Sequence, residues 1–250
     1  MYIREYGDPR NPVVILLAPL FLTGKQFYEM IHQYLRGDYF IIAPDHGGHG
    51  KSGEYISSKD EYEQLKKYLT EKGYTDIKLL YGASLGAATG WHIFNDSSFN
   101  IEKTWFDGVG LAESNPFIEW IMKRVFHKKK KDVERKYETV EAGLIKEYRE
   151  TIGKYMTDCL AKFDKKRIDA LCEACCRFEL KPLSDKQQES LHLDYGENEL
   201  NLRIINKAKT IEKYMPKVRP VVRKGLPHCG YIAFHLKEYV DELEEFTLKS

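Results

Sequence analysis

One stretch of the chain, residues 79–88, restricts the possible folds more than any other. It reads Leu-Leu-Tyr-Gly-Ala-Ser-Leu-Gly-Ala-Ala: an apolar strand, then Gly-x-Ser-x-Gly centred on Ser84, then small residues that can open a helix. In this pattern the serine occupies a sharp, strained turn that lifts its hydroxyl clear of a sheet. Gly82 and Gly86 remove side chains where the turning backbone approaches neighbouring strands. The stretch therefore predicts a strand, a serine-bearing turn and a helix in succession.

Apolar runs that alternate with helical patterns surround this stretch. The runs 13–18 and 39–43 are continuously apolar, as expected for strands buried on both faces. The turn-rich residues 7–12 suggest that the first two strands form a hairpin. Strands alternating with helices predict a mostly parallel sheet flanked by helices, an α/β fold whose ligands collect at the carboxyl ends of the strands. Further strands are expected at 2–6, 76–81, 103–109, 190–195 and 218–223.

Residues 112–186 have a different sequence pattern from the rest of the chain: they show helical periodicity with many charges and no convincing strand. The lysine run 128–131 is expected to be a solvated helix end or loop. We therefore predict an α/β core from residues 1–111 and 187–250, with 112–186 inserted as a helical cap. Helices are expected at about 115–126, 133–163 and 164–178. Apolar residues early in the cap would either face an apolar substrate group or form the cap's own core: Phe117, Trp120, Ile121, Met122 and Phe126.

The overall composition excludes several classes of protein. A net charge of +1 argues against a nucleic-acid surface, which normally shows a strong basic excess. No apolar run reaches the roughly 18 residues that a membrane-spanning helix needs, and the first residues lack the apolar core of a secretory signal. The 5 cysteines form no disulfide-like framework. A reducing cytoplasm is the simplest location.

Four motifs, taken together, resemble those of the α/β-hydrolase superfamily. Residues 82–86 match its serine turn, and Asp-His-Gly-Gly-His-Gly-Lys-Ser at 45–52 matches its D-x-x-G-H-G-x-S loop. Gly-Glu-Asn-Glu at 196–199 resembles the turn that carries the acid, and Pro-His-Cys-Gly at 227–230 resembles the loop that carries the histidine. The motifs occur in family order within the two core segments. The resemblance implies an α/β-hydrolase fold with a helical cap.

The chemistry of these residues is that of a catalytic triad. A serine hydroxyl needs a neighbouring base to become a good nucleophile near neutral pH, and His228 is the candidate base for Ser84. Glu199 would orient the imidazole, although the family usually has aspartate at this position. Asp194, on the strand before it, and Asp107, at the end of an earlier strand, remain alternatives. The order serine, acid, histidine is the order that this fold uses.

An oxyanion hole needs two N–H donors aimed at the developing negative charge. By position they are Leu85, next to the nucleophile, and Leu20, in the loop after the 13–18 strand. The family's usual His-Gly is Ala18-Pro19 here. Proline has no N–H to donate, but the residue after it does.

These features predict a serine hydrolase that cleaves a carboxylic ester or thioester through an acyl-enzyme, without metal or organic cofactor. Lysophospholipase-like and monoacylglycerol-lipase-like activities fall within this class. The expected partner is a small-molecule substrate with an apolar acyl or alkyl group. The alternatives are a non-hydrolytic or C–C-cleaving enzyme with the same triad, and a non-catalytic small-molecule receptor on the same fold. The sequence leaves the exact substrate and the oligomeric state open.

Overall fold

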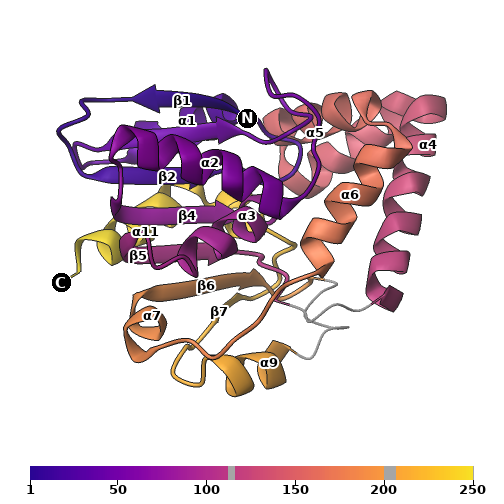
Figure 1. Ribbon diagram of the computed structural model, residues 1–250. Helices are drawn as coiled ribbons and strands as arrows, with labels where there is room; N and C mark the ends of the chain where they lie inside the picture. Colours follow the sequence, from indigo (N-terminus) through magenta and orange to yellow (C-terminus); the bar gives the residue numbers. More distant parts are fainter. Residues whose placement is uncertain (112–115, 200–206, 250) are drawn as a thin grey trace.

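A seven-stranded sheet forms the centre of the computed structural model, which describes residues 1–111, 116–199 and 207–249 (Figure 1). The strand order is β1-β3-β2-β4-β5-β6-β7, and every neighbouring pair is parallel except β1 with β3. The strands are β1 Tyr2–Tyr6, β2 Val13–Leu17, β3 Phe40–Asp45, β4 Asp76–Ala83, β5 Asn100–Asp107, β6 Leu191–Gly196 and β7 Val221–Arg223. The helices are α1 Gly24–Ile31, the 3-10 turn η1 His32–Tyr34, α2 Ser58–Lys72, α3 Leu85–Phe94, α4 Pro116–Tyr148, α5 Glu150–Lys162, α6 Lys165–Cys176, α7 Asp185–Ser190, α9 Lys207–Tyr214, α10 Gly230–Phe234 and α11 Leu236–Leu248.

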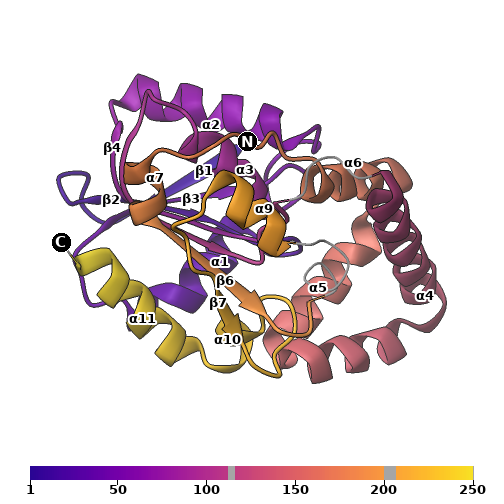
Figure 2. The ribbon, with the colours of Figure 1, turned by 90° about the horizontal axis from the view of Figure 1, so that it is seen from below.

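Helices cover both faces of the sheet, and this explains the continuous apolar runs. Every residue of β2 and β3 is buried. Ile15 packs on one face in a cluster with α2 and α3, whereas Leu16 packs on the other with α1 and α11. Figure 2 shows the same arrangement, with α2 and α3 above the sheet and α1 and α11 below it. Alternate side chains of a strand point to opposite faces, so both sets must be apolar.

The first strand corrects one expectation. The predicted hairpin between residues 2–6 and 13–17 is wrong, because β1 pairs antiparallel with β3, from Tyr2 opposite Asp45 to Tyr6 opposite Ile41. Both edges of β2 are already occupied, by β3 and by β4. The turn at 7–12 therefore carries the chain past β3 rather than back along its own strand.

Helices α4, α5 and α6 lie together beyond the carboxyl ends of the strands (Figures 1 and 2). The lysine run 128–131 lies within α4, so its expected place at a helix end or loop is wrong. The chain breaks its helical path later, at Lys136 (φ −145°, ψ 50°) and at Arg149 (φ 67°, ψ 170°). Asp164 then caps α6 by accepting the N–H of Arg167 at 2.7 Å.

This helical unit packs on the core through an apolar cluster above the serine turn. Leu85 and Phe21 of the core join Val133, Leu160 and other side chains of α4–α6 there. The apolar residues expected early in the insertion divide into two groups. Met122 and Phe126 pack against this cluster and Ile121 is partly buried. Phe117 and Trp120 are 64% and 53% exposed, so the expectation fails for these two.

The predicted start of the insertion, residue 112, lies outside the described residues. No helix within the described ranges is both long and apolar enough to cross a membrane.

Candidate active site

Ser84 occupies the turn between β4 and α3 with φ 48° and ψ −107°. A non-glycine residue held in such a region costs about 1–3 kcal/mol, so the surroundings must enforce it. They do so by a hydrogen bond from the Ser84 N–H to the Asp107 carbonyl at 2.7 Å and by close backbone approach. A Cβ atom at Gly86 would lie 2.1 Å from the Leu17 carbonyl oxygen, and one at Gly82 would also collide with the turn. Both glycines of the motif are thus sterically required.

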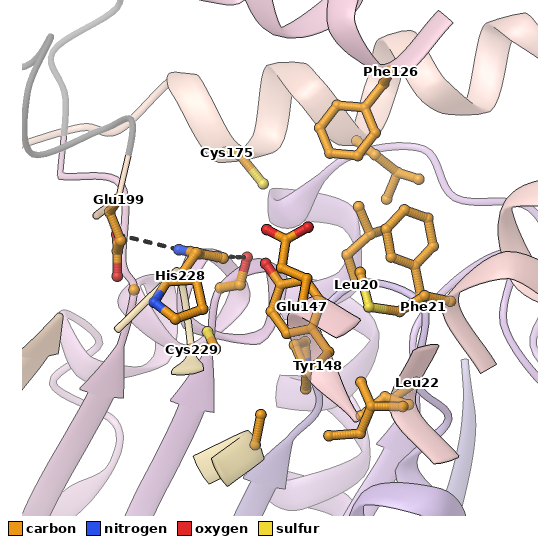
Figure 3. A pocket seen from close by; sticks show the side chains of 18 of the residues that line it. Leu20, Phe21, Leu22, Phe126, Glu147, Tyr148, Cys175, Glu199, His228 and Cys229 are labelled. Carbon is orange, nitrogen blue, oxygen red and sulfur yellow. Dashed lines mark hydrogen bonds and ion pairs between the residues drawn. The ribbon is translucent and has the colours of Figure 1, made fainter. Parts of the chain in front are cut away.

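His228 approaches this serine from the loop between β7 and α10. Its Nε2 lies 2.8 Å from Ser84 Oγ, and its Nδ1 lies 3.2 Å from Glu199 Oε2 (Figure 3). When Nε2 accepts the serine proton, Nδ1 carries its own proton toward the carboxylate. Gly108, with φ 65°, leaves space for the ring, because a Cβ there would lie 2.4 Å from His228 Cε1.

Glu199 is held rigidly in the turn after β6. Its side chain is 1% exposed, and its Oε1 accepts the N–H of Gly196 at 3.0 Å. The Glu199 N–H closes the turn by donating to the Gly196 carbonyl at 3.1 Å. A Cβ at Gly196 would lie 2.0 Å from the carbonyl oxygen of Pro227, so the acid turn and the histidine loop are in direct contact. Local backbone contacts thus fix the spacing of Glu199 and His228.

The two alternative acids have other surroundings. Asp194 accepts from Arg223 Nε at 2.8 Å and lies 2.6 Å from the same guanidinium's terminal nitrogen. Asp107 is 1% exposed, and burial together with the nearby Asp194 and Glu199 carboxylates raises its pKa well above the usual range. Of these three carboxylates, all in described segments, only Glu199 is within 4.0 Å of a His228 nitrogen.

The loop after β2 forms a tight turn beside the serine. Leu22 N–H donates to the Pro19 carbonyl at 3.3 Å, and Phe21 has φ 78°, a conformation that favours glycine. The predicted donor Leu20 lies in this turn and lines the same cavity as Ser84. The other predicted donor, Leu85, follows the serine directly as the first residue of α3.

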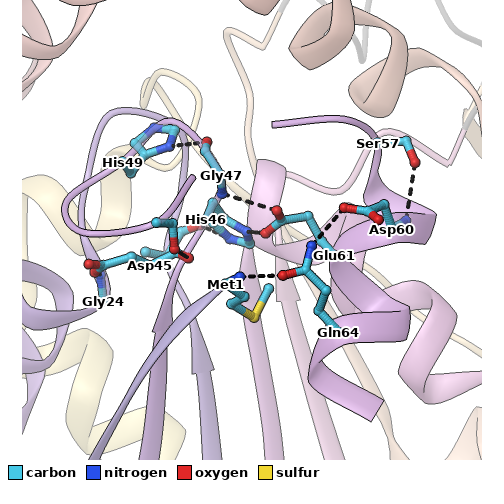
Figure 4. A network of polar contacts seen from close by, with 12 residues as sticks. Met1, Gly24, Asp45, His46, Gly47, His49, Ser57, Asp60, Glu61 and Gln64 are labelled. Atoms are coloured by element: carbon cyan, nitrogen blue, oxygen red, sulfur yellow. Dashed lines mark hydrogen bonds and ion pairs between the residues drawn. The ribbon is translucent and has the colours of Figure 1, made fainter. Parts of the chain in front are cut away.

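A buried polar network supports this turn from the 45–52 loop (Figure 4). His49 Nε2 accepts the N–H of Phe21 at 3.1 Å, which requires that Nδ1 carry the proton toward the Gly47 carbonyl, 3.0 Å away. Burial, followed by the neighbouring His46, lowers the pKa of His49 to about 4. The neutral ring can therefore act as an acceptor. His46 in turn places Nε2 3.1 Å from the Ala18 carbonyl and Nδ1 3.1 Å from a Glu61 carboxylate oxygen.

Solved structures of similar shape cover almost the entire chain. An α/β-hydrolase enzyme, MGS-M2, from a Medee basin deep-sea metagenome library has a TM-score of 0.73 at 13% identity, covering 100% of this chain and 94% of that one. An esterase (EaEST) from Exiguobacterium antarcticum has a TM-score of 0.72 at 13% identity, with 99% and 95% covered. A bromoperoxidase from Bacillus anthracis has a TM-score of 0.71 at 19% identity, with 99% and 95% covered. The chain has the α/β-hydrolase fold. The fold predicted from the sequence motifs is thereby confirmed.

The chain is less similar to known proteins in sequence than it is to the α/β-hydrolases in structure. No family model matches the chain. A 3-hydroxybutyrate-oligomer hydrolase from Cupriavidus necator is 27% identical over 127 residues, which are 48% of this chain and 43% of the relative. The match therefore spans less than half the length of either protein.

In this α/β-hydrolase fold, a cavity of about 340 Å³ lies between the sheet and α4–α6 and contains Ser84 and His228. It is within the roughly 300–1,000 Å³ usual for small-molecule sites. Three polar residues of α4 also line it, and the sequence reasoning had missed all three: Lys129, Glu147 and Tyr148. Their local sequence is that of an ordinary charged helix, so only the tertiary packing reveals them. The apolar walls include Leu20, Phe21, Leu22, Met122, Val125, Phe126, Ile152, Met156, Phe163, Ile168 and Leu171.

Proposed function

We propose that the chain is a serine hydrolase that cleaves a carboxylic ester or thioester through an acyl-enzyme. One observation carries the proposal: Ser84 Oγ, both nitrogens of His228 and a buried Glu199 oxygen form a continuous line with separations of 2.8 and 3.2 Å. These three residues line a cavity with mainly apolar walls. The solved esterases of the same fold and the partial relative named as a hydrolase are consistent with it.

In the proposed reaction, His228 Nε2 removes the Ser84 proton as Oγ attacks the carbonyl carbon. Glu199 holds the imidazole in the required tautomer and stabilises the imidazolium that forms. The same imidazolium then protonates the leaving alcohol or thiol. Water completes the cycle by attacking the acyl-enzyme with His228 again as base.

The developing oxyanion would be stabilised by the backbone N–H groups of Leu85 and Leu20. Leu85 is the first residue of α3, so its N–H belongs to the positive end of the helix dipole. The turn that contains Leu20 is held by the His49 contact to Phe21. A preorganised donor of this kind typically contributes about 10²- to 10³-fold to kcat.

We also propose that α4–α6 act as the cap of this enzyme and that the core consists of residues 1–111 and 187–250. The apolar walls supplied by the cap and by the loop after β2 suit an apolar acyl or alkyl group.

The test is covalent labelling with a fluorophosphonate, followed by mass spectrometry to locate the labelled residue. We expect labelling of Ser84 in the native protein, and a loss of at least about 10³-fold in the labelling rate in His228→Ala. His32→Ala is the matched control, because His32 is an exposed histidine in η1 and does not line the cavity. Circular dichroism verifies that each variant is folded.

Failure of folded native protein to label at Ser84 would contradict the hydrolase proposal, and ligand binding without turnover would become the next hypothesis. Labelling that persists unchanged in His228→Ala would contradict the role of His228. A panel of esters and thioesters, with product analysis, then separates hydrolysis from the other reactions of this fold.

A further inference from the structure

The junction between α4 and α5 holds a strained residue against the helix that follows His228. Arg149 has φ 67°, a left-handed conformation that is costly for a side chain of this size. Its guanidinium donates to the Phe234 carbonyl at 2.8 Å and lies 5.5 Å from the centre of the Phe234 ring. Phe234 ends α10, which begins two residues after His228. The clamp fixes the end of α4 relative to the proposed catalytic base.

This clamp directs the two preceding residues, Glu147 and Tyr148, into the cavity. In the view of Figure 3 both side chains lie in its middle, between His228 on one side and Leu20 and Phe21 on the other. Burial, followed by the adjacent Glu147 carboxylate, raises the pKa of the Tyr148 hydroxyl well above its usual range. Tyr148 therefore stays neutral and presents its ring to the cavity.

Glu147 is a carboxylate on an apolar site without a basic partner. Among the described residues, no Lys, Arg or His nitrogen lies within 4.0 Å of it, although Lys129 also lines the cavity. Glu147 is exposed and lines the cavity, so its carboxylate is open to solvent before substrate binds. A substrate that fills the cavity excludes this solvent and leaves the carboxylate with the neighbouring Tyr148 hydroxyl but no neutralising charge, which disfavours binding.

The substrate must therefore compensate for the lost water. A purely apolar ester cannot do so, and an anionic group beside Glu147 would be repelled. A hydroxyl offers one neutral hydrogen bond, whereas a cation neutralises the charge and is also attracted to the face of the Tyr148 ring.

We propose that Glu147 and Tyr148 form a cation subsite, and that the ester cleaved at Ser84 carries a positively charged nitrogen. This inference rests on the proposed hydrolase function and narrows its substrate class to cationic esters. The apolar walls would then hold the rest of the ester.

The experiment compares kcat/KM for esters that differ only in charge. On the alcohol side, butyrylcholine is compared with 3,3-dimethylbutyl butyrate, in which carbon replaces the charged nitrogen. On the acyl side, the p-nitrophenyl ester of 4-(trimethylammonio)butanoate is compared with that of 5,5-dimethylhexanoate. A hydroxyl-bearing ester, 4-hydroxybutyl butyrate, completes the set. Each ratio of cationic to neutral kcat/KM is measured in native protein, Glu147→Gln, Glu147→Asp and Glu138→Gln.

We expect native protein to prefer the cationic member of at least one pair, and Glu147→Gln to lower that ratio about 10-fold or more. Glu147→Asp should keep part of the preference. Glu138→Gln removes an equal charge from an exposed position on the same helix and should not alter the ratio. A ratio that falls equally in Glu138→Gln would indicate a long-range field effect and overturn the subsite.

Native protein that does not prefer the cationic member of either pair, or that prefers the hydroxyl-bearing ester to butyrylcholine, would also overturn the cation subsite. Ser84→Ala is measured on the same neutral esters. If it retains their turnover, the proposed serine-hydrolase function at Ser84 fails instead. The two failures are thus distinguishable within one set of measurements.

Discussion

His49 provides a sharp test of how the loop beside Ser84 is held in place. In the folded protein its pKa is lowered to about 4, because the ring is buried and lies near His46. The neutral ring accepts the Phe21 N–H at Nε2. In the unfolded chain a histidine titrates near 6.5. The replacement His49→Gln removes this titration, while the amide retains an oxygen that can accept from Phe21 and an N–H₂ that can donate toward Gly47.

The sign and size of the effect follow from proton linkage. Between these two pKa values the unfolded chain binds more protons than the folded chain, so the free energy of unfolding falls as the pH falls. The contribution of His49 is fully present above about pH 6.5 and is lost as the pH drops through about 4. A difference of about 2.5 pKa units corresponds to about 3 kcal/mol in total. Roughly 2 kcal/mol of this is lost between pH 7 and pH 4.5.

The assay is urea unfolding of native protein and His49→Gln at pH 7 and at pH 4.5. We expect native protein to lose about 2 kcal/mol more stability than the variant over this interval. His32→Gln, which replaces an exposed histidine, should behave like native protein. An identical pH dependence in native protein and His49→Gln would refute the assignment of a neutral, accepting His49 in the folded state.

Three further substitutions test other parts of the site. Glu199→Gln should lower kcat for an ester about 10²- to 10⁴-fold with little change in KM, as steady-state kinetics would show; near-native kcat would reassign the acid. Arg223→Met leaves Asp194 buried without its guanidinium and should cost about 3–5 kcal/mol in urea unfolding, unlike the near-zero cost of an ordinary surface pair. Gly86→Ala should prevent native folding, because its Cβ would lie 2.1 Å from a β2 carbonyl oxygen. Gly143→Ala is the control: it has open space around it and should stabilise α4 by about 0.5–1 kcal/mol. Comparable melting temperatures for the two variants would contradict the clash at Gly86.

Most strands could be predicted from the sequence because the burial of a strand determines its local pattern of apolar residues. A strand buried on both faces, such as β2, has to be apolar throughout, and this run is visible without a structure. The partner of β1 is a different matter, since strand pairing depends on which edges remain open after the whole sheet has formed. The breaks at Lys136 and Arg149 were likewise hidden, because neither residue is a glycine or a proline that would mark a helix break in the sequence.

In the site, too, residues in local motifs could be predicted and residues placed by tertiary contacts could not. Ser84 and His228 could be proposed because their motifs have steric requirements that only certain residues meet. Glu199 was less distinct, since a glutamate that follows polar turn residues is also a common surface pattern. Glu147 and Tyr148 could not be found, because their place in the cavity depends on a helix end fixed by a contact to the distant Phe234.

The insertion that contains α4–α6 lies between two neighbouring parallel strands of the sheet, β5 and β6. The chain leaves the carboxyl end of β5 at Asp107 and returns through α7 to the amino end of β6 at Leu191. A crossover of roughly a dozen residues is enough to join two neighbouring parallel strands, and the entropy of closing a longer connection grows slowly with its length. The inserted segment can therefore change in length and composition between related proteins, or be replaced by another segment. The sheet that holds Ser84 and His228 keeps its connectivity in either case.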